Sequence, residues 1–140
     1  MTLHDLVIKG IETAGPSATV EALALRLEEA NVGSIVVEEE MRPVGIVTDR
    51  DLALRVVARG ADPTETTAAD VMTADPVTIT IDAGLLDVTR LMRDHGVRRV
   101  PVVDDNDKLV GIITLDDVMS LLTRELDDLG DVIEAESGNY

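Results

Sequence analysis

The chain has 140 residues, of which 45% are hydrophobic, and 28 acidic against 12 basic residues give it a formal net charge of −16. This length and apolar content predict one compact domain, or two small halves packed closely, with a real hydrophobic core. The absence of cysteine excludes disulfides, thiolate nucleophiles and Cys-based zinc sites, and leaves His4 and His95 as the only imidazole donors. We therefore expect no metal chemistry.

The acidic charge also limits the partners. It repels nucleic-acid phosphates and anionic lipids, so we expect neither nucleic acid nor a membrane as a partner. No stretch approaches the roughly 18 consecutive apolar residues of a membrane span, and Asp5 interrupts the N-terminal run that a signal peptide would need. These features predict a cytoplasmic protein. Only Lys9 and Lys108 are lysines, a balance that resembles proteins of salt-accumulating halophiles; the alternative is an ordinary acidic cytoplasmic protein.

The first half of the chain has the pattern of a small α/β unit. Residues 17–31 form an amphipathic helical pattern with Val20, Leu23 and Leu27 on one face. Two apolar runs follow at 34–38 and 44–48, joined by a polar turn, and predict a hairpin of buried strands. A second helix is predicted over 49–60, with Leu52, Val56 and Val57 facing inward. The Pro- and Thr-containing segment that follows reads as a linker that ends in a short helix.

The second half repeats this order. A helix is predicted over 83–96, and Gly96 is placed to end it in a left-handed conformation. Strands at 100–104 and 109–114 form the second hairpin. The last predicted helix places four apolar side chains on an inner face: Val118, Leu121, Leu122 and Leu126.

The two halves are copies of one unit. "GIVTDRDL" at 45–52 matches "GIITLDDV" at 111–118, and residues 11–57 match 77–123 at a constant offset of 66 without a gap. A unit of this size alone would bury only about 60% of its unfolded surface. We therefore predict an α/β fold of two strand-helix-strand-strand-helix units, related by a pseudo-twofold axis and packed through their small sheets. The predicted divisions are a first unit at 1–62, a linker with a short helix at 63–76, a second unit at 77–126 and an acidic tail at 127–140.

The repeated phrase allows two interpretations. Thr48 with Asp51, and Thr114 with Asp117, have nearly the spacing of a capping box, in which the two side chains bond the amides of a helix N-terminus. The same residues suit a ligand site, because a helix N-terminus attracts anions and a carboxylate can accept from a ribose diol. A cap does not explain the glycine that precedes it in both copies, since glycine in a strand often marks close approach by a ligand or another backbone.

Together with "HGVRRVPVVDDNDKLV" at 95–110, the phrase G-h-h-T-x-x-D, in which h is apolar, resembles the cystathionine-β-synthase-type (CBS) domain. The resemblance spans nearly the whole chain and is looser in the first copy, which lacks the counterpart of Pro101. It implies a tandem CBS pair, or Bateman module, that binds AMP, ADP, ATP or S-adenosylmethionine between its units. It further implies a non-catalytic regulator that forms a homodimeric disc of four CBS units and signals in trans to an effector protein.

The resemblance also assigns residues to two ligand sites. Asp51 and Asp117 would bind ribose hydroxyls, while Thr48 and Thr114 would contact ribose or phosphate. Arg98 and Arg99 fall where nucleotide-binding relatives, including the γ subunit of AMP-activated protein kinase, place basic residues near phosphates. Arg50 would take a similar rim position in the first copy, and Asp116 replaces it in the second. The backbone that flanks adenine would lie around Val32, Ile46, Val77 and Ile112.

Two other functions remain open at this point. The chain could be an interaction or dimerisation module whose pockets have lost their ligand. An enzyme is less favoured, because no set of nucleophile, base and orienting residue is recognisable in the sequence.

Overall fold

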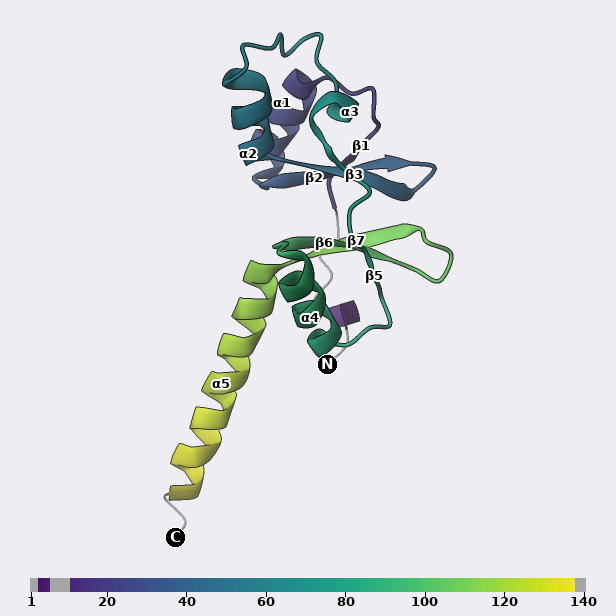
Figure 1. Cartoon of the computed structure of the whole chain (residues 1–140). Coiled ribbons are helices and arrows are strands. Elements are labelled where there is room, and N and C mark those ends of the chain that lie inside the picture. The colour runs from purple at the N-terminus through teal and green to yellow at the C-terminus, as the bar shows by residue number, and fades with distance from the viewer. Residues whose placement is uncertain (1–2, 6–10, 138–140) are drawn as a thin grey trace.

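The computed structural model describes residues 3–5 and 11–137 and contains two small sheets that face each other, each backed by helices (Figure 1). The first sheet has the order β1-β2-β3-β4 and the second the order β5-β6-β7. In each, the first strand is parallel to the second and the next pair is an antiparallel hairpin. The structure therefore confirms the predicted α/β fold of two repeated units.

The short helix η1 (Leu3–Asp5) comes first in the chain. The elements of the first unit are β1 (Thr13–Ala14), α1 (Val20–Ala30), β2 (Ser34–Glu39), β3 (Arg42–Thr48), α2 (Asp49–Leu52), the π-helical turn η2 (Ala53–Val57), α3 (Ala68–Val71) and β4 (Thr73–Ala74). Those of the second unit are β5 (Ile79–Thr80), α4 (Leu85–His95), β6 (Arg99–Val103), β7 (Leu109–Thr114) and α5 (Leu115–Ser137). Of the helices in the described residues, none is both long and apolar enough to cross a membrane.

Local chemistry sets the bounds of the main helices. Thr19 caps α1, because its Oγ1 accepts a hydrogen bond from the Ala22 amide at 3.2 Å. Asn31 ends α1 in the left-handed conformation, with φ of 53°. Gly96 ends α4 in the same way with φ of 63°, as the sequence predicts.

Each unit has its own apolar core, and a third apolar cluster joins the two sheets. This third cluster consists of Val36 and Ile46 from the first unit, Leu109 and Ile112 from the second, and the partly buried Ile11. The hairpins also touch, since the Leu109 amide donates to the Met41 carbonyl at 2.7 Å. Packing of sheet against sheet, predicted because one unit alone is too small, is therefore observed.

The chain passes from one unit to the other twice, once before β1 and once after β4. Leu3 is fully buried in the core of the second unit, although it precedes the first unit in sequence. Ala68 and Val71 of α3, from the segment predicted as a linker, are buried in the core of the first unit. β4 then adds to the edge of the first sheet. Leu3 therefore ties the start of the chain to the second unit, while α3 and β4 complete the first unit.

The short helix α3 is held by its own capping box. The backbone amide and the hydroxyl of Thr67 both donate to Asp70 Oδ2, at 2.9 and 3.0 Å, and these bonds lower the pKa of the Asp70 carboxyl. A carboxylate with a lowered folded-state pKa stabilises the fold above its unfolded-state pKa, and this contribution is lost as the pH falls through the folded-state value.

Three inward-facing predictions are wrong. Val57 is 78% exposed, because the π-helical turn η2 shifts the register and leaves Val56 as the buried side chain. Leu122 and Leu126 are 42% and 69% exposed, because α5 leaves the body of the protein and runs on as one helix to Ser137 (Figure 1). Helix thus occupies 127–137, within the segment predicted as a tail.

Candidate functional site: two cavities between the sheets

Both copies of the repeated phrase end a strand and cap a helix. The Thr48 amide donates to Asp51 Oδ2 at 2.9 Å, and the Asp51 amide donates to Thr48 Oγ1 at 3.1 Å. The corresponding distances in the second copy, between Thr114 and Asp117, are 3.0 and 3.2 Å. The capping interpretation is therefore confirmed in both copies, and one oxygen of each aspartate is committed to the cap.

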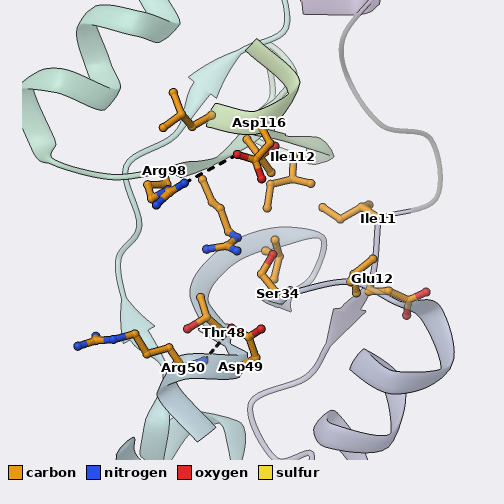
Figure 2. Close-up of a pocket in the computed structure, with 15 residues that line it drawn as sticks. Ile11, Glu12, Ser34, Thr48, Asp49, Arg50, Arg98, Ile112 and Asp116 are labelled. Carbon is orange, nitrogen blue, oxygen red and sulfur yellow. Dashed lines mark hydrogen bonds and ion pairs between the residues drawn. The ribbon is translucent and has the colours of Figure 1, made fainter. Parts of the chain in front are cut away.

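A cavity of about 550 Å³ lies between the two sheets and is lined from both units (Figure 2). Figure 2 shows the labelled Thr48, Asp49 and Arg50 of the first unit across the cavity from Arg98 and Asp116 of the second. The complete lining is Ile11, Glu12, Val32, Gly33, Ser34, Val36, Thr48, Asp49, Arg50, Arg98, Arg99, Ile112, Thr114, Leu115 and Asp116. We call it the larger cavity.

A second cavity of about 380 Å³ shares three of these residues, Thr48, Arg98 and Arg99. Its other walls come from β3, from the chain between the units, and from the end of α4. They are Ile46, Thr73, Asp75, Pro76, Val77, His95 and Val97. We call it the smaller cavity.

The repeat relates the two cavities to each other. Five residue pairs separated by the offset of 66 have one member in each cavity. The pairs are Ile11 with Val77, Val32 with Arg98, Gly33 with Arg99, Ile46 with Ile112, and Thr48 with Thr114. The larger cavity therefore includes the repeat counterpart of part of the smaller one, and it extends further across both units, since it also holds both Arg50 and Asp116, which are counterparts of each other.

The two copies of the repeat differ most at one pair of positions, where the second copy has two arginines and the first has a valine and a glycine. Arg98 and Arg99 of the smaller cavity correspond to Val32 and Gly33 of the larger. A Cβ atom at Gly33 would lie 3.1 Å from Arg99 Nη2. Because glycine stands there, the Arg99 guanidinium packs directly over the backbone, and Arg99 lines both cavities.

The charges of the two cavities differ as well. The larger has three arginines, Arg50, Arg98 and Arg99, against three acids, Glu12, Asp49 and Asp116. The smaller has two arginines, Arg98 and Arg99, against Asp75 alone. Arg98 Nη2 lies 3.8 Å from Asp116 Oδ1, but both side chains are well exposed and such a pair contributes little stability. The Arg98 guanidinium therefore remains available to an anion.

Ten of the twelve residues that the sequence nominates line at least one cavity: Val32, Ile46, Thr48, Arg50, Val77, Arg98, Arg99, Ile112, Thr114 and Asp116. Asp51 and Asp117 line neither cavity, and each is hydrogen-bonded to the capping threonine of its own copy. Arg50 and Asp116, which the sequence assigns to different sites, both line the larger cavity.

Sequence reasoning did not nominate several polar lining residues. Asp49 adjoins Thr48 in the repeated phrase and could have been found there. Glu12 and Asp75 lie in the segments that enter each unit and carry no motif, so only the fold brings them to a cavity. Glu12 is already paired, since Arg26 Nη2 donates to its Oε2 at 2.9 Å.

Gly45, which precedes the capping threonine, is required for packing against a neighbouring side chain. A Cβ atom at this position would collide with the Met72 side chain, whose Cγ would be 2.8 Å away. The close neighbour is thus a side chain from the segment between α3 and β4. The sequence predicted close approach by a ligand or another backbone at this glycine, whereas the structure places the Met72 side chain there.

We expect Gly45→Ala to lower the free energy of unfolding by roughly 1–3 kcal/mol, because Met72 must move from its packed position. Gly15→Ala is the matched control, since a Cβ atom at Gly15 meets nothing within 4 Å. Chemical denaturation of both variants measures the difference. Equal stabilities would contradict the packing role of Gly45.

No group of three or more His, Cys, Asp or Glu side chains that could hold a metal ion occurs among residues 3–5 and 11–137. Arginine, threonine, acidic and apolar side chains line the two cavities. Such a lining suits a partly apolar molecule that carries an anionic group, because the arginines provide charge-assisted hydrogen bonds and the side chains of Ile46 and Val77 provide apolar contact.

Comparison with known proteins connects this architecture to a family. The model of the CBS domain matches the chain twice, over residues 3–58 and 68–124. A CBS domain-containing protein of Bacillus subtilis, YhcV, is 37% identical over 117 residues, which are 84% of this chain and 82% of that protein. A protein of Methanopyrus kandleri is 36% identical over 122 residues, and the match covers 86% of this chain but 62% of that protein.

A solved structure adds a ligand to the comparison. The CBS domain protein PAE2072 from Pyrobaculum aerophilum, complexed with AMP, matches with a TM-score of 0.76 and 28% identity. The match covers 84% of this chain and 89% of that one.

Proposed function

Because the chain belongs to the CBS domain family, we propose that it is a regulatory module that binds an adenosyl ligand between its two CBS units. The observation that carries the proposal is the pair of repeat-related cavities, each walled by a capping threonine and by Arg98 and Arg99. Their volumes, about 550 and 380 Å³, fall within the range of small-molecule sites. The AMP complex of the Pyrobaculum aerophilum relative supports the ligand class.

In the smaller cavity, we propose that the adenine packs between Ile46 and Val77 and that the phosphate faces Arg98 and Arg99. The corresponding apolar walls in the larger cavity are Ile112 and Ile11, and Val32 stands where the smaller cavity has Arg98. Asp51 and Asp117 each keep one carboxylate oxygen outside the cap, and this oxygen is the acceptor we propose for a ribose hydroxyl. A ribose would reach it by inserting past Thr48 or Thr114.

We propose that the two sites prefer ligands of different charge. The smaller cavity has an excess of basic side chains and suits AMP, ADP or ATP. In the larger cavity Asp49 and Asp116 offset the arginines, so a ligand with less negative charge, such as S-adenosylmethionine, suits it better.

A thermal-shift panel of AMP, ADP, ATP, S-adenosylmethionine and NAD tests the ligand class. A ligand at about 100 times its Kd adds roughly 2.7 kcal/mol to the free energy of unfolding, which raises the Tm of a domain of this size by several degrees. Absence of a shift with every compound would contradict ligand binding and would favour a module that acts through its surfaces alone.

We further propose that the ligand regulates by favouring one of two arrangements of the units, which another protein or a second copy of the module then reads. The family match and the CBS-domain relatives support the prediction that the chain is not an enzyme. The homodimeric disc, the effector in trans and the cytoplasmic location stay predictions.

We also propose that the acidic surface is adapted to high salt. The net charge of −16 repels itself at low ionic strength, and salt screens this repulsion. We therefore expect the Tm to rise between dilute buffer and molar potassium chloride. Melting curves followed by circular dichroism measure this rise, and equal Tm values in both conditions would contradict the adaptation.

A further inference from the structure

Arg55 lies outside both cavities, on the π-helical turn η2 that follows the capping box of the first unit. Its side chain is partly buried and has two partners. Nη1 donates to the Val71 carbonyl at 2.6 Å, and Nε lies 3.9 Å from Asp51 Oδ1. The arginine therefore bridges the aspartate of the repeated phrase and the last residue of α3.

The oxygen that faces Arg55 is the one that the cap leaves free. Asp51 Oδ2 accepts a hydrogen bond from the Thr48 amide at 2.9 Å, and Oδ1 is directed toward the guanidinium. At 3.9 Å the pair is not hydrogen-bonded, so the lone pairs of Oδ1 stay open to a hydroxyl. The Asp51 side chain is only 15% exposed, so water and salt screen this attraction less than that of a surface pair. Arg55 thus limits rotation of the carboxylate without occupying its acceptor.

The other partner of Arg55 leads into a wall of the smaller cavity. The Val71 carbonyl is at the C-terminal end of α3, where carbonyls have no partner within the helix. The guanidinium supplies a charge-assisted hydrogen bond there. From Val71 the chain runs through β4 to Pro76 and Val77, which line the smaller cavity. One side chain therefore connects the ribose acceptor proposed for this cavity with the segment that supplies its apolar wall.

The second copy of the repeat has no cation at this position. The counterpart of Arg55 at the offset of 66 is Leu121, which is 5% exposed. The π-helical turn is missing as well, because α5 runs as a regular α-helix through this position. Asp117 has the same capping bonds as Asp51, but an apolar side chain stands where the first copy has a guanidinium. The two aspartates therefore differ in what orients their free oxygen.

We propose that Arg55 is a positioning residue for ribose recognition in the smaller cavity, where it holds Asp51 Oδ1 toward the hydroxyls of the ligand. The role rests on the proposed binding of an adenosyl ligand. Of the two capping threonines, Thr48 lines the smaller cavity and Thr114 does not, so Asp51 is the aspartate that a ribose bound there would meet. A preorganised acceptor binds its donor more tightly, because less conformational freedom is lost on binding.

Titration calorimetry of the full-length chain with AMP and with dideoxy-AMP tests this role, because dideoxy-AMP keeps the adenine and the phosphate but lacks both ribose hydroxyls. Arg55→Leu, which introduces the residue of the second copy, is expected to weaken AMP binding about 3- to 10-fold. The affinity for dideoxy-AMP is expected to stay within a factor of about two. Arg55→Lys keeps the positive charge and is expected to recover most of the lost affinity for AMP.

Arg59→Leu is the matched control, since Arg59 follows on the same segment, is exposed and lines neither cavity. In an Asp51→Asn background, Arg55→Leu is expected to leave both affinities unchanged, because the arginine acts through the aspartate. Circular dichroism checks that the variants fold. The ratio of the two affinities within one variant does not depend on the folded fraction.

Equal losses for AMP and dideoxy-AMP in Arg55→Leu would make the arginine a structural link to Val71 and would overturn the proposed role. So would an unchanged affinity for AMP, or an equal loss in Arg59→Leu. A wild-type chain that binds AMP and dideoxy-AMP equally well would overturn ribose recognition but leave the ligand class intact. A wild-type chain that binds neither compound would contradict the proposed function, and the role of Arg55 with it.

Discussion

Leu109→Ala is expected to lower the free energy of unfolding by about 2–5 kcal/mol, because it removes a side chain from the cluster that joins the two sheets and leaves a cavity there. Leu109 is 9% exposed and packs with Val36, Ile46 and Ile112. It lines neither cavity, so the loss reports on contact between the units and not on a lost ligand contact.

Val110→Ala is the control for this effect. Val110 is the next residue on β7, but it points to the other face of the strand and is 41% exposed. Its truncation is expected to change the stability by no more than about 0.5 kcal/mol. Urea denaturation of both variants measures the contrast. Comparable losses at the two positions, or two separate transitions in the wild type, would show that the units do not fold against each other.

Arg99→Gln is expected to weaken AMP binding by about 10- to 150-fold, because a charge-assisted hydrogen bond contributes roughly 1.5–3 kcal/mol. Arg99 lines both cavities, so neither site compensates for the other. Adenosine lacks the phosphate, and its affinity is expected to stay within a factor of about two, an interaction of a few tenths of a kcal/mol at most.

Titration calorimetry with AMP and with adenosine separates these outcomes. Arg90→Gln is the matched control, since Arg90 is exposed on α4 and lines neither cavity. Arg50→Gln distinguishes the sites, because Arg50 lines the larger cavity only. Equal losses for AMP and adenosine would assign Arg99 a structural role, and unchanged AMP affinity would place the phosphate elsewhere.

Much of this architecture follows from the repeat. The constant offset of 66 predicts two equal units, and the small size of each predicts their packing. The repeated Thr and Asp predict the caps that the structure contains. Ten of the twelve nominated residues line a cavity, because both copies of the repeated motif face the space between the sheets.

The remainder depends on tertiary structure that local patterns do not encode. The apolar spacing of "LDDVMSLLTRELDDLG" predicts an inner face through Leu126, yet α5 leaves the body and exposes that side chain. The same apolar spacing occurs in helices that pack in a core and in helices whose apolar face stays exposed, and only the path of the helix distinguishes the two cases. Likewise, nothing in a single copy shows that Leu3 packs in the second unit, or that Arg50 and Asp116 share a cavity.

The central claim is that an adenosyl ligand binds between the units, and a crystal structure of the chain with AMP tests it most directly. The proposal predicts adenine between Ile46 and Val77 in the smaller cavity, with the phosphate beside Arg98 and Arg99. AMP bound outside both cavities, or two empty cavities in crystals saturated with AMP, would contradict the claim.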